Sequence, residues 1–166
     1  MTNSSAVRID RAHARDVDRI AELFHADMQD LGVESEVAQQ RALVQAALSG
    51  DGSTTWVRVA RVADGRVIGV ILANVALSVK FGGRTLWIEE LYVDPGARQG
   101  GVGRMLVEHM LEWAAEHGIV GVDLEAYRMN TGASILYRSL GFDRLPRERY
   151  AFAMADYLPA NEKGPS

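Results

Sequence analysis

Hydrophobic positions along this chain recur with two different periods, and the changes of period mark the predicted elements. Val17, Ile20, Ala21 and Phe24 have helical spacing, which predicts a first helix. A second helix is expected from about Glu36 to Leu48. A short strand over 7–10 precedes both helices. Runs rich in β-branched and aromatic residues then predict strands over 55–62, 67–77 and 85–93, with an Asp-Gly hairpin signal between the first two.

Helical spacing returns in the second half of the chain. A long helix is expected from about 101 to 117, followed by a strand over 120–126 and a helix that begins at Asn130. A last pair of strands is expected over 142–145 and 149–155, on either side of Pro146. This order predicts an α/β (α+β) fold with a mixed, mostly antiparallel sheet and helices on both faces. We expect one domain over 1–158 and a flexible polar tail over 159–166.

The connection between the 85–93 strand and the long helix has the composition of an anion-binding loop. It reads V-D-P-G-A-R-Q-G-G-V-G-R-M-L from Val93 to Leu106. Glycine lets backbone N–H groups approach an anion, and a helix N-terminus supplies unpaired N–H groups with partial positive charge. We therefore expect a phosphate-binding loop. The spelling excludes the dinucleotide fingerprint and the Walker loop, and leaves open a glycine-rich connection without a ligand.

A second motif lies about thirty residues further along the chain. Asn130, Ala133, Tyr137, Gly141 and Phe142 spell N-x-x-A-x-x-x-Y-x-x-x-G-F. Asn130 suits a helix N-cap and Gly141 suits the position after a helix end. Asn130 and Tyr137, seven residues apart, are expected to share one face of this helix.

The order and spacing of the two motifs resemble the GNAT superfamily of acyl-CoA-dependent N-acetyltransferases. The resemblance extends over roughly residues 6 to 157. It implies a GNAT-like sheet, acetyl-CoA as cosubstrate and an amine acceptor. Many members have glycine where this chain has Gln99, and Gly100 is expected to supply the flexibility lost there. The residues that the resemblance assigns to acetyl-CoA binding are Leu91, Tyr92, Val93, Arg98, Gln99, Gly100, Gly101, Val102, Gly103, Arg104, Asn130 and Ala133.

The candidate catalytic residues are Glu89 and Tyr137. Carboxylates in an apolar strand have raised pKa values and can act as bases near neutral pH. By resemblance, the position four before Val93 is Glu89, and Glu90 is the alternative base. Strand alternation would place Glu89 on the face of Trp87 and Val93, with Glu90 opposite. Tyr137 is the candidate acid for the leaving thiolate, with a buried core tyrosine as the alternative. The resemblance also implies that the main-chain N–H near Val93 contacts the thioester carbonyl.

A group of acidic residues lies between the first two helices: Glu22, Asp27, Asp30, Glu34 and Glu36. They could select a cationic amine, although a plain solvated surface is the favoured interpretation. His109 and His117 lie beside an acidic stripe and are interpreted as part of a solvated helix face.

Composition narrows the function further. The chain is 48% hydrophobic, carries a net charge of −4 and has no cysteine. The net charge argues against nucleic acid, and no apolar run suggests a membrane span. Absence of cysteine and of an H-E-x-x-H motif argues against a metal site and a cysteine acyl-enzyme. We expect a cytoplasmic protein without a metal, and leave a homodimer open.

The sequence therefore predicts an N-acetyltransferase that moves an acetyl group from acetyl-CoA to a primary amine of a polyamine, aminosugar, amino acid or protein. Attack is expected to be direct, within a ternary complex. The alternatives are a non-catalytic acyl-CoA-binding module or sensor, and a nucleotide-binding module.

Overall fold

The computed structural model of the chain describes residues 6–50 and 52–154. The helices and strands follow the predicted order as far as the Asn130 helix. In chain order they are β1 (Arg8–Arg11), η1 (Ala14–Asp16), α1 (Val17–Asp30), α2 (Val37–Ser49), β2 (Thr55–Arg61), β3 (Val67–Ser78), β4 (Gly83–Val93), η2 (Pro95–Ala97), α3 (Val102–Glu116), β5 (Gly121–Leu124) and α4 (Thr131–Ser139).

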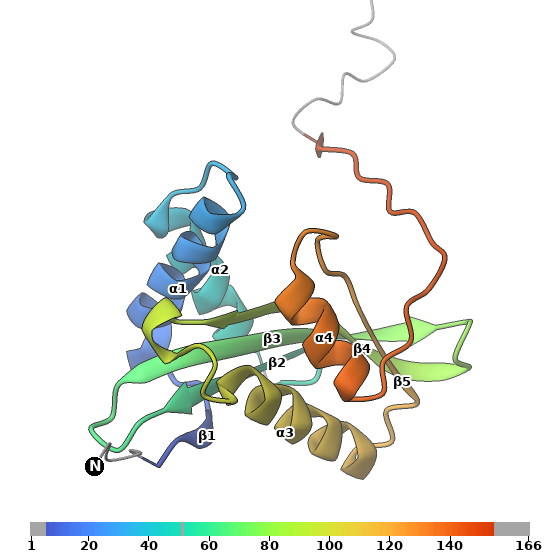
Figure 1. The fold of residues 1–166 in the computed structure, drawn as a ribbon, viewed down its shortest axis with the longest axis horizontal. Helices are drawn as coiled ribbons and strands as arrows, with labels where there is room; N and C mark the ends of the chain where they lie inside the picture. Colours follow the sequence, from blue (N-terminus) through green and yellow to red (C-terminus); the bar gives the residue numbers. More distant parts are fainter. Residues whose placement is uncertain (1–5, 51, 155–166) are drawn as a thin grey trace, which may run out of the picture.

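The strands form a mixed sheet in the order β1-β2-β3-β4-β5. Each neighbouring pair is antiparallel except β4 and β5, which are parallel. Figure 1 shows α1 and α2 behind the sheet, with α3 and α4 in front of it. The predicted fold class, a mostly antiparallel mixed sheet with helices on both faces, is therefore confirmed.

Each face of the sheet has its own hydrophobic core. Ile20 and Phe24 of α1 pack with Val59 and Val70 on one face. On the other face, apolar residues of α3 and Tyr137 of α4 pack against β2, β3 and β4. Because apolar strand residues face both layers of helices, the middle strands read as nearly continuous hydrophobic runs, such as the fully buried stretch Val67–Ala73 of β3.

The final pair of strands is a wrong prediction for the residues that the structure describes. Residues 142–154 contain no strand (Figure 1), although Phe142 packs on the core and Arg149 lies against Trp87 of β4 and pairs with Glu125. Leu145, Tyr150, Phe152 and Met154 are exposed, although alternating apolar residues favour a half-buried strand. Alternating apolar residues form a strand only where a sheet edge is available to pair with them. The edge strand here, β5, has just four residues and offers little to pair with. Ala155 and the expected tail 159–166 lie outside the described residues.

No helix within the described ranges is both long and apolar enough to cross a membrane.

Candidate active site

The edge of β4 opens where β5 stops following it. The two strands pair only from Thr85–Gly121 to Ile88–Leu124, while β4 continues to Val93. On its other edge β4 stays paired with β3, and the N–H of Asp94 donates to the carbonyl of Ile68 at 2.9 Å. We call the gap between β4 and β5 beyond Ile88 the strand fork.

Backbone groups of β4 point into the strand fork at alternate residues. Since Asp94 bonds to β3, alternation directs the groups of Leu91 and Val93 to the opposite edge. Two side-chain contacts agree with this direction. The Leu91 N–H donates to Glu90 Oε1 at 3.0 Å, and Arg98 Nε donates to the Val93 carbonyl at 3.0 Å. The N–H of Val93 therefore lies on the open edge, as expected of a donor to a thioester carbonyl.

A β-bulge occurs at the two adjacent glutamates. Leu72 pairs with Glu90 but Ala73 pairs with Ile88, so Glu89 is the extra residue in β4. As a result Ile88 and Leu91, three residues apart, pack on the same core. Val93 packs on that core too, which puts it on the face opposite Trp87. The predicted common face of Trp87 and Val93 is therefore wrong, because one inserted residue shifts the period-two alternation.

Glu90 lies against a second carboxyl group, that of Asp27 on α1. Burial, and then the charge and hydrogen bond of Asp27, raise the pKa of Glu90 to about 8. Burial also raises the pKa of Asp27. Two carboxyl groups this close cannot both ionise readily, so the pair holds one proton near neutral pH. Glu89, by contrast, is exposed.

Tyr137 of α4 is buried and lies within electrostatic reach of this carboxyl pair. Burial, together with the smaller effect of the charges of Glu90 and Asp27, raises the pKa of the Tyr137 phenol to about 12. Its ring makes an edge contact with Phe142, with centroids 5.7 Å apart. The two candidate interpretations of Tyr137, core residue and acid, are thus compatible. The phenol keeps its proton over the whole physiological range.

The predicted phosphate loop leads directly into α3. Gly101 is the N-cap residue of α3 and has a left-handed backbone, with φ of 79°. Gln99, which stands where many family members have glycine, also adopts a positive φ of 65°. The expectation that Gly100 would supply the flexibility lost there is therefore wrong. Gln99 itself takes the conformation that glycine favours, at a cost of about 1–2 kcal/mol.

Gly103 and Val102 set the position of this loop. A Cβ on Gly103 would lie 3.5 Å from Leu136 of α4 and 3.9 Å from Val93 of β4. The first turn of α3 therefore packs against α4 and against the end of β4 beside the strand fork. Val102 is buried in the core shared by α3 and α4.

Two arginines flank the phosphate loop, and both are held by other side chains. Arg98 Nη2 lies 3.1 Å from Asp30 Oδ2, and its guanidinium stands 5.0 Å above the Tyr92 ring. The Tyr92 hydroxyl donates to the same carboxylate oxygen at 3.0 Å. Arg104 donates to Ser139 Oγ at 2.5 Å and to Glu108 Oε1 at 3.1 Å. Arg98 thus ties the end of β4 to α1, and Arg104 ties α3 to α4.

The second motif forms the helix that its spelling predicts. Asn130 Oδ1 accepts a hydrogen bond from the Ala133 N–H at 3.0 Å, which caps α4. At the other end Gly141 has φ of 88°, and the N–H groups of Gly141 and Phe142 donate to the carbonyls of Arg138 and Tyr137 at 3.1 and 3.0 Å. This is a Schellman ending. It fixes the turn that lets Phe142 pack against Tyr137.

The pairing of Asp27 with Glu90 was not predicted from the sequence. A signal was available, since Asp27 continues the core-facing stripe of Ile20, Leu23 and Phe24 at helical spacing.

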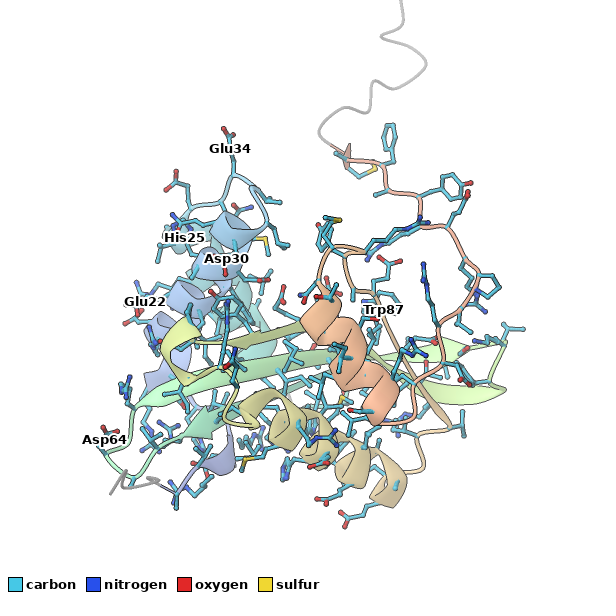
Figure 2. The ribbon with its side chains drawn as sticks, in the orientation of Figure 1. Glu22, His25, Asp30, Glu34, Asp64 and Trp87 are labelled. Atoms are coloured by element: carbon cyan, nitrogen blue, oxygen red, sulfur yellow. The ribbon has the colours of Figure 1, made fainter. Side chains whose placement is uncertain are left out.

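Figure 2 shows Asp30 and Glu34 near the end of α1, with Trp87 on the other side of α4. Glu22, Glu34 and Glu36 are exposed, as a solvated surface requires.

Among the described residues, no group of three or more His, Asp or Glu side chains is arranged to hold a metal ion. The predicted loop at the α3 N-terminus lies beside Val93 of β4, and Glu90 of the same strand lies near Asp27 of α1 and Tyr137 of α4.

Comparison with known proteins agrees with this geometry. Residues 17–142 match the model of the Acetyltransferase (GNAT) family. The chain is 34% identical over 111 residues to streptothricin acetyltransferase of Streptomyces lavendulae, a match covering 67% of this chain and 49% of that protein. It is 38% identical over 63 residues to the bS18-alanine N-acetyltransferase of Salmonella typhimurium, covering 38% and 43% respectively. The chain thus spans about half the length of these curated relatives or less.

Solved structures show the same fold over nearly whole chains. A possible acetyltransferase from Clostridium difficile 630 superposes with a TM-score of 0.77 at 25% identity, covering 89% of this chain and 97% of that one. The complex of AAC(6')-Iy with a CoA-S-monomethyl-acetylneamine bisubstrate analogue superposes with a TM-score of 0.75 at 20% identity, covering 90% and 99%. With a family match over most of its length, this chain belongs to the Acetyltransferase (GNAT) family.

Proposed function

We propose that this chain is an N-acetyltransferase that transfers an acetyl group from acetyl-CoA to a primary amine by direct attack in a ternary complex. One observation supports the proposal above all others. The unpaired edge of β4 at the strand fork lies beside the phosphate loop and the proton-holding groups of Glu90, Asp27 and Tyr137.

The residues at the α3 N-terminus suit the pyrophosphate of acetyl-CoA. Five consecutive backbone N–H groups surround the start of the helix, those of Gln99, Gly100, Gly101, Val102 and Gly103. Arg98 and Arg104 add positive charge beside it. Along the fork, Leu91, Tyr92, Val93, Asn130 and Ala133 are proposed to line the rest of the cosubstrate. The Val93 N–H would stabilise negative charge on the thioester oxygen.

A primary amine must lose a proton before it can attack, because its conjugate acid has a pKa of about 10.4. Glu90 is the better placed of the two candidate bases, since its pKa of about 8 lies between that of the ammonium ion and neutrality. Asp27 keeps this pKa high. Glu89 remains the alternative, and its exposure on the bulge leaves it open to an acceptor.

The amine nitrogen loses two protons in the balanced reaction. The ammonium ion gives the first to Glu90, and the free amine nitrogen then bonds to the acetyl carbon. The carbon–sulfur bond breaks and the sulfur leaves with the electron pair. Tyr137 is proposed to donate a proton to that sulfur, and the second proton lost by the nitrogen restores the phenol after it has donated. A phenol that stays protonated to about pH 12 is available as a donor at any working pH.

The acceptor is proposed to be a small-molecule or protein primary amine. The curated relatives' names refer to streptothricin and to an alanine of ribosomal protein bS18. Carboxylates at the acceptor side of the fork, Asp27 and Glu90 with exposed Glu89, favour a cationic amine.

Release of the CoA thiol from acetyl-CoA, followed over a panel of polyamines, aminosugars, amino acids and peptide N-termini, tests this proposal. We expect amine-dependent release for at least one class. Saturable acetyl-CoA binding without release for any amine would instead favour the non-catalytic sensor.

A further inference from the structure

The outer edge of the sheet carries an unusual pair of arginines. Arg11 is the last residue of β1 and lies directly opposite Arg58 of β2. Side chains of directly opposed residues project on the same face of a sheet, and like charges in that arrangement repel. The charge of Arg11 indeed lowers the pKa of Arg58, after the larger effect of burial.

Neither arginine has an acidic partner within the part of the chain that the structure describes. Ion pairs there involve other arginines, such as Arg61 with Asp16 at 3.0 Å and Arg19 with Asp94 at 2.5 Å. Arg58 instead donates Nη1 to the carbonyl of Val57 at 3.0 Å, and its guanidinium lies 4.5 Å from the centre of the Trp56 ring. These contacts fix the guanidinium in place and leave further N–H donors for a ligand.

A hollow of about 170 Å³ lies beside this pair. Its lining includes Arg11, Arg58, Trp56 and Trp113, closed by Ala47 and Leu48 of α2. The hollow is smaller than the sites that hold drug-sized ligands, which are about 300–1,000 Å³. It suits a small ion better than a nucleotide.

The indole Nε1 of Trp56 is fully buried and has no hydrogen-bond partner among the described residues, so it does not open onto the hollow. The two opposed arginines are therefore the charged groups beside this hollow.

We propose that Arg11 and Arg58 form a binding site for a small oxyanion, a carboxylate or phosphate group. The planar guanidinium matches both groups through paired N–H donors. The site is separate from the phosphate loop, because Trp113 lies twelve residues beyond Gly101, about 18 Å along the axis of α3. An anion there would relieve the repulsion at the end of β1 and so stabilise the edge of the sheet.

Anion titration in a Trp87→Phe background tests the site, because Trp56 and Trp113 are then the fluorescent reporters. Inorganic phosphate and succinate are titrated separately at constant ionic strength set by sodium chloride. Excess CoA occupies the loop at the start of α3, so that phosphate binding there does not contribute to the fluorescence change. We expect a saturable fluorescence change with at least one of the two anions. The anion that produces it shows whether the site binds a phosphate or a carboxylate group.

Variants separate the site from general charge effects. Arg11→Gln and Arg58→Gln should each weaken the anion affinity tenfold or more, while Arg84→Gln, an exposed arginine on β4, should leave it unchanged. In anion-free buffer Arg11→Gln should raise the melting temperature, because it removes the like charge, and should abolish the rise that the anion gives the parent. A destabilised Arg58→Gln would not affect this second readout.

Two outcomes would overturn the proposal: no saturable change in the parent, or the same affinity in Arg11→Gln as in the parent. Neither of these results depends on acetyl transfer, so the site and the proposed function fail or stand separately.

Discussion

A carboxyl group that is buried beside another carboxyl group is costly to ionise, and this fact sets the chemistry at Glu90. Its neighbours are Asp27, which raises its pKa, and the Leu91 N–H, which lowers it. The result, about 8, is suited to accepting a proton from an ammonium ion. Burial, and then the charges of the same two carboxyl groups, raise the pKa of the Tyr137 phenol and keep it protonated. Base and acid are thus tuned by one cluster.

The pH dependence of the rate should report Glu90. A base works when deprotonated, and the folded-state pKa of Glu90 is raised, so kcat should increase with pH up to about 8 and then level off. Glu90→Gln should remove this increase and lower kcat by about 10²–10⁴-fold. Initial rates from pH 6 to 9.5 provide the measurement.

Glu89→Gln is the matched control for this experiment. It removes the adjacent, exposed carboxylate and should leave the shape of the pH profile in place. If Glu89→Gln flattens the profile while Glu90→Gln keeps it, the base is Glu89, as the family resemblance first suggested.

Tyr137→Phe removes one oxygen and keeps the ring contact with Phe142. If Tyr137 is the acid, kcat should fall by about 10²–10⁴-fold with little change in acetyl-CoA affinity. The loss of unfolding free energy should not exceed about 1–2 kcal/mol. A lower melting temperature together with the parental kcat would assign Tyr137 to the core alone.

At the scale of elements, local signals predicted well what local interactions determine. Asn130 and Gly141 mark both ends of α4, because capping bonds are made within a few residues of the chain. The bulge at Glu89 could not be predicted, since it depends on the register between β3 and β4. The pairing of Asp27 with Glu90 was not predicted either, because the two residues lie 63 apart in the chain. The strands expected after Phe142 required an edge that alternation alone does not supply.

The first turn of α3 offers a test of the phosphate loop. Gly101→Val places a β-branched residue at φ of 79°, and Gly103→Val adds methyl groups where α3 meets Leu136. Both should raise the KM for acetyl-CoA strongly while the protein remains folded, because the new side chains obstruct the backbone N–H groups.

Gly65→Val is the control for backbone strain in this experiment. Gly65 has φ of 92° in the β2–β3 turn with open space around it. Its substitution should cost similar stability and leave KM unchanged. An unchanged KM in both α3 variants would remove support for the phosphate loop.

At the scale of the whole molecule, the site lies where the two cores meet. Asp27 comes from the helix layer on one face, and Tyr137 and the α3 N-terminus come from the other. They reach one another because β4 and β5 part after four residue pairs and leave an opening through the sheet edge. The motif spacing and the order of elements were sufficient to predict the mixed sheet and its two layers of helices, apart from the two strands expected after Gly141. The contacts across the opening required the structure.

Binding of acetyl-CoA at the strand fork is the claim on which every other step depends. Thermal unfolding with and without millimolar acetyl-CoA tests it directly, because a ligand that binds only the folded state stabilises it by mass action. At a hundred times its dissociation constant, acetyl-CoA should add about 2.7 kcal/mol to the free energy of unfolding, and Gly101→Val should lose most of that gain. No shift with acetyl-CoA, alongside a clear shift with ATP, would contradict the account.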